Sequence, residues 1–341
     1  GSKLAFPLKE KDVHLTNHTT VDINDTEIVA IIGRVTMDYE IALEFPPLLR
    51  IFKDGRVERL LGMQTIPARD DPQTGVQCRD TVVSEDKNLS ARLYLPKTDD
   101  QQPHKIPLII YIHGGGFCVQ SPFSPSYYGH LVALSSKANV IIAAIEYRKA
   151  PEHLLPVAYD DSWDAVKWIA SHAGGSGPAE WLNKHADFER VWIAGEASGA
   201  NIAHSLMVRS AAEELPAGFK LVGMALVQPY FEDEERVRLK FLDYIYPTKK
   251  GWADPMINPV GAGSEHLGSL PCSKVLVSVA SEDAMVGNAG VRYYEGLKKS
   301  SWIGEAKLLV SEGEGHIFHL KNPNCAKAVE LIDWIKSSVW T

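Results

Sequence analysis

The sequence predicts an α/β protein with a mostly parallel sheet of about eight strands and helices on both faces. Short apolar runs alternate with amphipathic helical patterns from about residue 90 onward, which is typical of this class. The runs at 140–145 and 222–227 are apolar almost throughout, as strands buried on both faces should be. A strand, a glycine-bounded turn and a helix follow one another over residues 190–204. The length of 341 residues and the hydrophobic content of 45% suit one such domain with a large core.

The expected strands are apolar runs, often rich in β-branched residues and bounded by turn residues. They cover residues 90–95, 107–113, 139–147, 190–195, 221–229, 274–280 and 306–311. Between them, apolar residues recur at helical spacing. The expected helices cover residues 158–172, 199–215, 288–302 and 324–339.

Two segments interrupt this alternation and predict a lid. Residues 37–70 precede the sheet, and residues 230–266 are charged at first and then aromatic and proline-rich. Insertions at the carboxyl ends of strands are where an α/β fold carries its binding apparatus. Residues 1–36 have no clear periodicity, and Gly1-Ser2 resembles the remnant of an expression tag. We expect an irregular extension over 1–36 and one α/β domain over 37–341.

The turn within residues 190–204 has the frame of a nucleophile elbow, in which a strained strand-to-helix turn presents an attacking hydroxyl. In α/β-hydrolases this motif reads G-x-S-x-G. Here the flanking glycines are Gly195 and Gly199, so the middle position is Ala197, which carries no nucleophile. Ser198 stands one residue late, where the flanking residues lack the freedom of glycine. We interpret the chain as an α/β-hydrolase scaffold whose nucleophile position holds alanine.

A glycine triplet supplies the second part of a hydrolytic site. Residues 113–117 read His-Gly-Gly-Gly-Phe and follow an expected strand. In lipases and esterases, such a loop and the N–H after the nucleophile stabilise the oxyanion of a tetrahedral intermediate. The donors expected here are the N–H groups of Gly115, Gly116 and Ser198. A glycine triplet alone would also fit a tight turn, but strand, triplet and elbow in this order favour an oxyanion hole.

The remaining partners of a catalytic triad should follow as an acid and then a histidine. Asp283 follows the strand expected at 274–280, with Glu282 as its rival and a helix cap as its plain structural interpretation. His316 follows the strand expected at 306–311, with His319 as its rival and a surface loop as the alternative. The glycines that immediately precede His316 favour it, so we expect Asp283 and His316 to form the pair.

These motifs together resemble the plant carboxylesterases, in the hormone-sensitive-lipase-like branch of the α/β-hydrolases. The resemblance rests on 113–117, 146–153, the elbow, Asp283 and Gly315-His316, and on the opening segment 47–59. It covers about residue 37 to the C-terminus. This family includes esterases, gibberellin receptors, 2-hydroxyisoflavanone dehydratases, tuliposide-converting enzymes and some alkaloid cyclases. The elbow is similar to that of the dehydratases, where threonine can replace serine. Departures from the family are Ala197 and Lys149, where leucine is usual.

Three explanations of Ala197 follow. Alanine replaces a serine or threonine, so that the parent enzyme hydrolyses a small plant ester or lactone while this chain is inactive as an esterase. Alternatively, the enzyme is a lyase, dehydratase or cyclase that uses His316 as a base and the oxyanion hole for an enolate. Thirdly, the protein is a receptor that binds its ligand in an inactive pocket. An intact Asp283–His316 pair argues against a receptor, since binding alone gives little reason to keep a base.

The motifs also suggest a pocket and its partners. Aromatic or apolar neighbours of the motifs are candidates for the substrate-binding wall, although core packing would explain many of them: Phe117, Phe123, Tyr230, Phe231, Ile317 and Phe318. No metal or organic cofactor is implied. The net charge of −8, without a basic stripe, argues against nucleic acid and anionic membranes as partners. Four widely spaced cysteines favour free thiols and a cytoplasmic protein, with the plastid as an alternative.

Overall fold

The computed structural model describes residues 40–98, 104–232, 240–248, 250–261 and 264–341. The expected extension over 1–36 therefore lies outside the described residues, as do parts of the expected lid at 37–39, 233–239, 249 and 262–263. The main sheet has eight strands, which are β4 (Gln77–Ser84), β5 (Leu89–Leu95), β6 (Ile106–Ile112), β7 (Ile141–Glu146), β8 (Ala186–Glu196), β9 (Leu221–Val227), β10 (Lys274–Ala280) and β11 (Glu305–Ser311).

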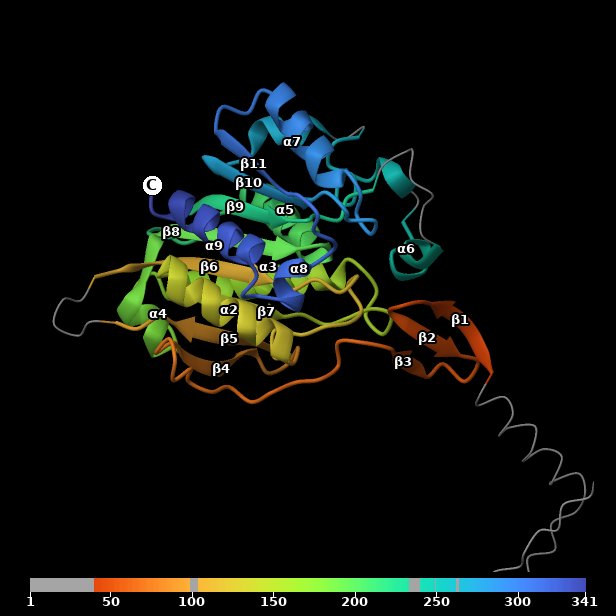
Figure 1. The fold of residues 1–341 in the computed structure, drawn as a ribbon, viewed down its shortest axis with the longest axis horizontal. Helices are drawn as coiled ribbons and strands as arrows, with labels where there is room; N and C mark the ends of the chain where they lie inside the picture. The colour runs from red at the N-terminus through yellow and green to blue at the C-terminus, as the bar shows by residue number, and fades with distance from the viewer. Residues whose placement is uncertain (1–39, 99–103, 233–239, 249, 262–263) are drawn as a thin grey trace, which may run out of the picture. The chain divides into compact units, whose positions relative to one another are not determined.

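The prediction of a mostly parallel sheet is confirmed. Its strand order is β11-β10-β9-β8-β6-β7-β5-β4 (Figure 1). All pairs from β7 to β11 are parallel, whereas β5 runs antiparallel to both β4 and β7. All seven residues of β6 are buried, as its continuous apolar run predicts. Because parallel strands end at the same edge, the loops after β6, β8, β10 and β11 meet there.

Helices cover both faces of the sheet, again as predicted. They are α2 (Pro125–Ala138), α3 (Val157–Ala170), α4 (Glu180–His185), α5 (Ser198–Ser210), α6 (Lys240–Ile245), α7 (Ala289–Lys299), α8 (Phe318–Lys321) and α9 (Ala326–Val339), with short 3-10 turns at Gly251–Ala253 and Ser264–Ser269. Figure 1 shows α2 and α9 in front of the sheet and α3 and α5 behind it. The front layer packs residues such as Leu131 and Leu331 on Tyr111 and Trp192 in one apolar core. No helix in the described ranges is long and apolar enough to cross a membrane.

Several elements were not expected from the sequence, among them the short helices α4, α6 and α8, and two longer elements, β4 and α2. Strand β4 lies at the edge of the sheet, where Cys78 is buried while Gln77, Arg79 and Asp80 are exposed, so its composition is mixed. Helix α2 is buried on most of its circumference, including Tyr127, and therefore lacks a one-sided apolar pattern. It begins after Ser124 with Pro125 in the first turn, where the missing N–H of proline breaks no helical hydrogen bond.

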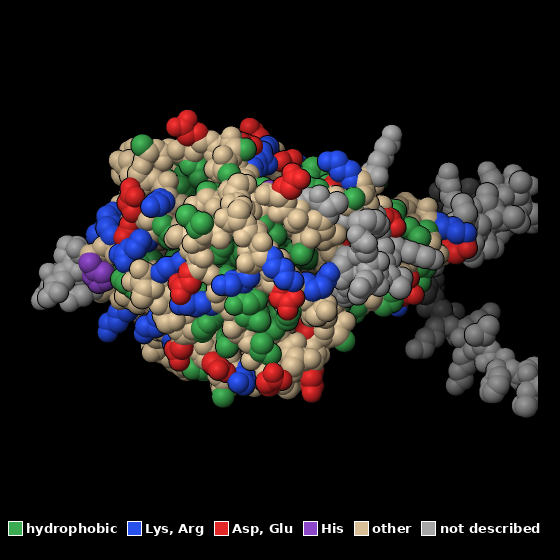
Figure 2. Space-filling view, turned by 90° about the horizontal axis from the view of Figure 1, so that it is seen from above, with side chains coloured by type: hydrophobic (Ala, Val, Ile, Leu, Met, Phe, Trp, Pro, Cys, Tyr) green, Lys and Arg blue, Asp and Glu red, His purple; other side chains and the backbone are tan. Residues whose placement is uncertain are grey.

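Residues before the main sheet form three short strands, β1 (Ile41–Phe45), β2 (Leu49–Phe52) and β3 (Val57–Arg59), in a sheet of their own. The four cysteines are free thiols. On the surface drawn in Figure 2, Lys and Arg side chains are interspersed with Asp and Glu rather than gathered in one stripe.

Candidate active site

The turn between β8 and α5 has the geometry of a strained elbow. Ala197 has φ +50° and ψ −119°, a left-handed backbone that L residues rarely adopt. A Cβ atom on Gly195 would lie 2.6 Å from the Gly199 carbonyl carbon, and one on Gly199 would lie 2.2 Å from the Ile112 oxygen. Only glycine fits at both positions, so the register that places Ala197 at the centre of the turn has a steric cause.

The acid and the histidine meet at the same sheet edge. His316 Nδ1 donates a 2.8 Å hydrogen bond to Asp283 Oδ2. The other carboxylate oxygen, Oδ1, accepts from the N–H groups of Met285 and Val286 at 3.0 and 3.1 Å. Burial alone would raise the pKa of Asp283, but the hydrogen bond and charge of His316, with these two amides, lower it. Asp283 is therefore an ionised partner that orients the His316 ring, and among the described residues the Nε2 atom of that ring has no hydrogen-bond partner.

The rival residues lie elsewhere. His319 is fully buried, and its ring packs against that of His130 at a centroid distance of 4.8 Å. Glu282 is exposed, and its backbone N–H donates to the Glu314 carbonyl. Asp283 does not cap α7, because that helix begins at Ala289 with Asn288 at the capping position.

The glycine loop after β6 presents backbone N–H groups beside the elbow. Gly115 has φ +100° and Gly116 has φ +60°. A Cβ atom on Gly115 would lie 2.2 Å from the Val119 oxygen, so the loop turns too tightly for a side chain there. Within the described part of the chain, the N–H groups of Gly115, Gly116 and Ser198 have no hydrogen-bond acceptor. These donors lie on the wall of the cavity that contains Ala197 and His316.

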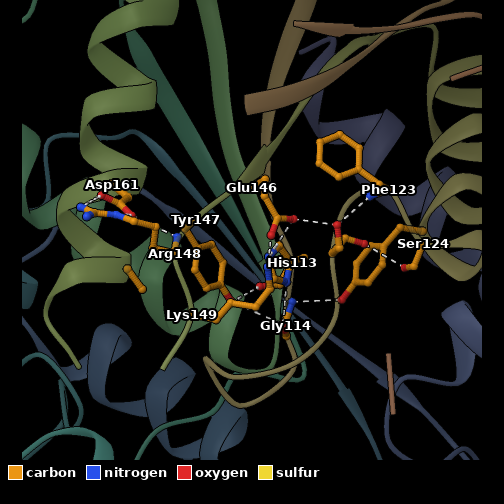
Figure 3. Close-up of polar contacts among 12 residues, drawn as sticks. His113, Gly114, Phe123, Ser124, Glu146, Tyr147, Arg148, Lys149 and Asp161 are labelled. Atoms are coloured by element: carbon orange, nitrogen blue, oxygen red, sulfur yellow. Dashed lines mark hydrogen bonds and ion pairs between the residues drawn. The ribbon is translucent and has the colours of Figure 1, made fainter. Parts of the chain in front are cut away.

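A polar cluster behind the glycine loop holds it from the other side (Figure 3). The His113 ring stacks on Tyr147 at 4.2 Å, and the Tyr147 hydroxyl donates to the His113 carbonyl at 3.0 Å. Glu146 accepts from the Ser121 hydroxyl at 2.7 Å and pairs with Lys149. Burial, and secondarily the Lys149 charge, lower the pKa of His113 well below its usual value, so His113 is a neutral anchor of the loop.

Sequence reasoning missed Glu196, the residue before the elbow centre. Its buried carboxylate accepts hydrogen bonds from the Tyr111 hydroxyl and the Gly114 N–H, both at 2.6 Å, and a third from the Tyr127 hydroxyl. Burial raises its pKa to about 7, although these donors favour the ionised form. An acidic residue at the end of an apolar strand is a sequence signal for a buried carboxylate. Its partners could not be read from the sequence, because they lie on or just after β6 and on α2.

A second missed residue is Gln228, the first residue after β9. It is fully buried, and its side-chain amide contacts both Asp283 and the backbone on either side of His316. A lone glutamine after a strand gives no signal of this kind in a sequence.

The cavity at the site measures about 300 Å³ and is lined mainly by apolar side chains. Three of the expected wall residues, Phe117, Tyr230 and Ile317, line it. Phe123 and Phe231 are not among the residues that line it. The Arg92 guanidinium lies 4.9 Å over the Phe123 ring, and Phe231 stacks on Tyr293 at 5.0 Å in the core.

Phe318 is also absent from the wall, because it packs in a small core cluster with Ala280 and Ala328. The wall does include residues from both segments that were expected to form a lid. They are Pro47, Leu48 and Leu61 from the first and Tyr230, Phe241, Leu242 and Ile245 from the second. Among the described residues, no group of three or more His, Cys, Asp or Glu side chains is arranged to hold a metal ion.

Comparisons with known proteins agree with the fold. Residues 109–320 match a family model described as the alpha/beta hydrolase fold, and residues 54–152 match one described as the carboxylesterase family. Probable carboxylesterase 13 of Arabidopsis thaliana is 44% identical over 87% of this chain and 97% of its own length. A 2-hydroxyisoflavanone dehydratase of Glycyrrhiza echinata is 42% identical over 89% of this chain and 97% of its own length.

Solved structures are similar in fold. A hyperthermophilic esterase of Pyrobaculum calidifontis superimposes with a TM-score of 0.61 at 22% identity, covering 77% of this chain and 85% of that one. A thermophilic carboxylesterase cloned from a metagenomic library gives a TM-score of 0.62 at 24% identity, covering 81% and 90%. At these identities the likeness concerns the arrangement of the chain.

Proposed function

This chain belongs to the carboxylesterase family of the α/β-hydrolase fold, and on that premise we propose a site built for a small, largely apolar carboxylic ester or lactone of plant metabolism. One observation carries the proposal. His316 and Asp283 form a hydrogen-bonded pair at the edge where a sterically fixed elbow presents Ala197. This arrangement supports a hydrolytic site that lacks only the attacking hydroxyl. Ala197 therefore stands where a serine or threonine would act, and the chain as it is should not form an acyl-enzyme.

With serine at position 197, the chemistry follows from the neighbouring groups. His316 Nε2 would take the hydroxyl proton while the oxygen attacks the carbonyl carbon, and Asp283 would stabilise the imidazolium. The Gly115, Gly116 and Ser198 N–H groups would bind the oxyanion. Collapse of the intermediate would release the alcohol with the proton from His316, and water would then cleave the acyl-enzyme by the same steps. The apolar wall of the 300 Å³ cavity supports an apolar acyl or alcohol group.

A lid would exclude water from these steps. We assign this role to Pro47, Leu48 and Leu61 and to α6, because Leu48 and Phe241 line the cavity from separate segments of the chain. A Cβ atom on Gly116 would lie 2.9 Å from Leu48 and 3.7 Å from Phe241, so both side chains pack directly over the oxyanion loop. The Phe45 ring lies 5.0 Å from that of Phe241 and joins the two segments.

The second candidate function is elimination, favoured by the intact base beside an elbow without a hydroxyl. His316 Nε2 would remove a proton from the carbon next to a carbonyl, and the oxyanion donors would stabilise the enolate. Loss of a β-hydroxyl with the proton carried by His316 would form the carbon–carbon double bond and release water. The 42% identical 2-hydroxyisoflavanone dehydratase makes this a natural alternative. A binding protein is the third candidate, but binding needs neither Asp283 nor the free Nε2 of His316.

Restoring the hydroxyl tests the leading proposal. Ala197→Ser should release p-nitrophenol from a short p-nitrophenyl ester with a burst, because acylation becomes possible. The unaltered chain should be slower by up to about 10⁶-fold in kcat, the scale of a lost triad nucleophile. Equal rates for the two proteins would rule out hydrolysis through position 197. Burst kinetics absent from a folded Ala197→Ser protein would move the assignment to elimination.

A further inference from the structure

We propose that Gln228 is a positioning residue that fixes the acid, the histidine and the elbow relative to one another. The inference rests on the proposed use of His316 as the base at this site. Gln228 does not line the cavity, so it does not bind the substrate. It acts through Asp283 and the loop that carries His316.

The backbone at Gln228 turns its side chain toward the sheet edge. Gln228 directly follows β9 and has φ +44°, in the left-handed region that favours glycine. Its N–H donates a 2.7 Å hydrogen bond to the backbone carbonyl of Ser278, on the neighbouring strand β10. Gln228 is fully buried, and a strained backbone conformation persists only where surrounding contacts stabilise it. Here the stabilising contacts are the hydrogen bonds of the Gln228 side chain.

All polar atoms of the Gln228 side chain are used, and each contact concerns the acid–base pair. Nε2 donates to Asp283 Oδ2 at 2.8 Å and to the Gly315 carbonyl at 3.0 Å. Oε1 accepts from the Ile317 N–H at 2.8 Å. Gly315 and Ile317 are the residues on either side of His316. The Gln228 amide therefore hydrogen-bonds the backbone immediately before and immediately after His316. It also fixes the same carboxylate oxygen that accepts from His316 Nδ1.

The same short segment reaches the elbow. The carbonyl of Val227 accepts from the Ala197 N–H at 3.1 Å, and the Tyr230 N–H donates to the Ala197 carbonyl at 3.0 Å. Residues 227–230 therefore contact the nucleophile position through the backbone and the acid–base pair through Gln228. Only a primary amide offers two donors and an acceptor without charge, which explains why glutamine suits this place.

The first test is spectroscopic and needs no turnover. The full chain, with Ala197 as it stands and with labelled histidine, should show a strongly deshielded imidazole Nδ1 proton, assigned by its loss in His316→Ala. Gln228→Met keeps the length and volume of the side chain but removes the three hydrogen bonds. We expect this signal to disappear or to exchange rapidly in Gln228→Met, because the ring is no longer held against Asp283.

Ser278→Ala is the matched control, since Ser278 is equally buried on β10 and its hydroxyl has no hydrogen-bond partner among the described residues. Its imidazole signal should match that of the unaltered chain. An unchanged signal in a folded Gln228→Met protein would overturn the proposal and leave Gln228 as a space-filling residue. If Gln228→Met does not fold, Gln228→Glu takes its place, because it keeps the shape and replaces the donating amide by an acceptor.

A second measurement uses the unaltered chain. The side-chain NH₂ protons of Gln228 should exchange with solvent far more slowly than those of the exposed Gln73 and Gln77. The reason is that both NH₂ protons of Gln228 are hydrogen-bonded in the interior. Exchange as fast as that of the exposed glutamines would contradict the contacts on which the proposal depends.

The third test separates positioning from binding. If Ala197→Ser has esterase activity, adding Gln228→Met should lower its kcat by about 10²-fold and change KM far less, because the ring is displaced while most of the cavity wall comes from other segments of the chain. A change in KM alone would refute the assigned role. If Ala197→Ser shows no esterase activity, the proposed hydrolysis fails, whereas the imidazole signal still decides the role of Gln228.

Discussion

Glu196 Oε2 accepts a 2.6 Å hydrogen bond from the hydroxyl of Tyr111, inside the sheet and one residue before the elbow centre. The other oxygen of the same carboxylate accepts from the Gly114 N–H, the first amide of the glycine loop. Because Glu196 is fully buried, these contacts hold the elbow against the glycine loop without competition from water. The relative placement of the elbow and the glycine loop thus depends on a carboxylate other than that of Asp283.

This carboxylate should make stability depend on pH in an unusual direction. Burial raises its pKa in the folded protein to about 7 from an ordinary value of 4.5, so the folded state holds the proton more tightly than the unfolded state. The resulting stabilisation is present below about pH 4.5 and is lost as the pH rises through about 7. Compared with Glu196→Gln, the unaltered chain should lose on the order of 3 kcal/mol of unfolding free energy across this range.

Urea unfolding followed by circular dichroism at several pH values measures this difference. Glutamine is the matched replacement, since it keeps the side-chain length and an acceptor for the Gly114 N–H while it does not titrate. Parallel pH profiles for the two proteins would contradict a raised pKa at position 196.

The elbow glycines should be sensitive to a single methyl group. A Cβ atom on Gly199 would lie 2.2 Å from the Ile112 carbonyl oxygen, which belongs to β6 and cannot move alone. We expect Gly199→Ala to lower the free energy of unfolding by roughly 1–3 kcal/mol. Gly174→Ala is the control, because a Cβ atom there meets nothing within 4 Å, and its effect should stay within about 1 kcal/mol. Equal effects in calorimetry would show that close packing at the elbow is unimportant.

The sequence predicts those parts of the site that local patterns determine. A buried parallel strand is a continuous apolar run, and an elbow needs glycine on both sides of one residue, so β8 and Ala197 can be located without a structure. Asp283 and His316 follow from strand order, because parallel strands end at one edge. The same reasoning cannot separate Tyr230 from Phe231, since which of two adjacent aromatic residues faces the cavity depends on how the chain leaves β9.

The features that the sequence did not predict depend on contacts between segments that lie far apart in the chain. Gln228 matters because three strand ends meet around it, and that meeting is not encoded in any short segment. Helix α2 was missed because it packs on several sides at once. The edge strand β4 was missed for the opposite reason, since its exposed face gives it a polar composition.

The lid assignment predicts a change in acyl-chain preference. Phe241 lines the cavity from α6, so Phe241→Ala should lengthen the space available to the substrate. In an active Ala197→Ser protein, the ratio of kcat/KM for a longer to a shorter p-nitrophenyl ester should rise by about 10-fold. Tyr244→Ala is the control on the same helix, because Tyr244 is exposed and does not line the cavity. An equal rise of this ratio in both variants would show that Phe241 does not determine acyl-chain preference.

Removal of the base distinguishes the three candidate functions. His316→Ala should abolish the burst of Ala197→Ser, because the new hydroxyl then has no general base. If the natural reaction is elimination, His316→Ala should abolish turnover of the natural substrate whether position 197 holds alanine or serine. His153→Ala is the matched control, since this histidine is exposed and its removal leaves the Asp283 contact in place. A binding protein would retain its ligand affinity in His316→Ala and show no turnover in any background. Esterase activity that survives in Ala197→Ser after His316 is removed would contradict the assigned base, because hydrolysis through position 197 requires the proton to leave through the His316 ring.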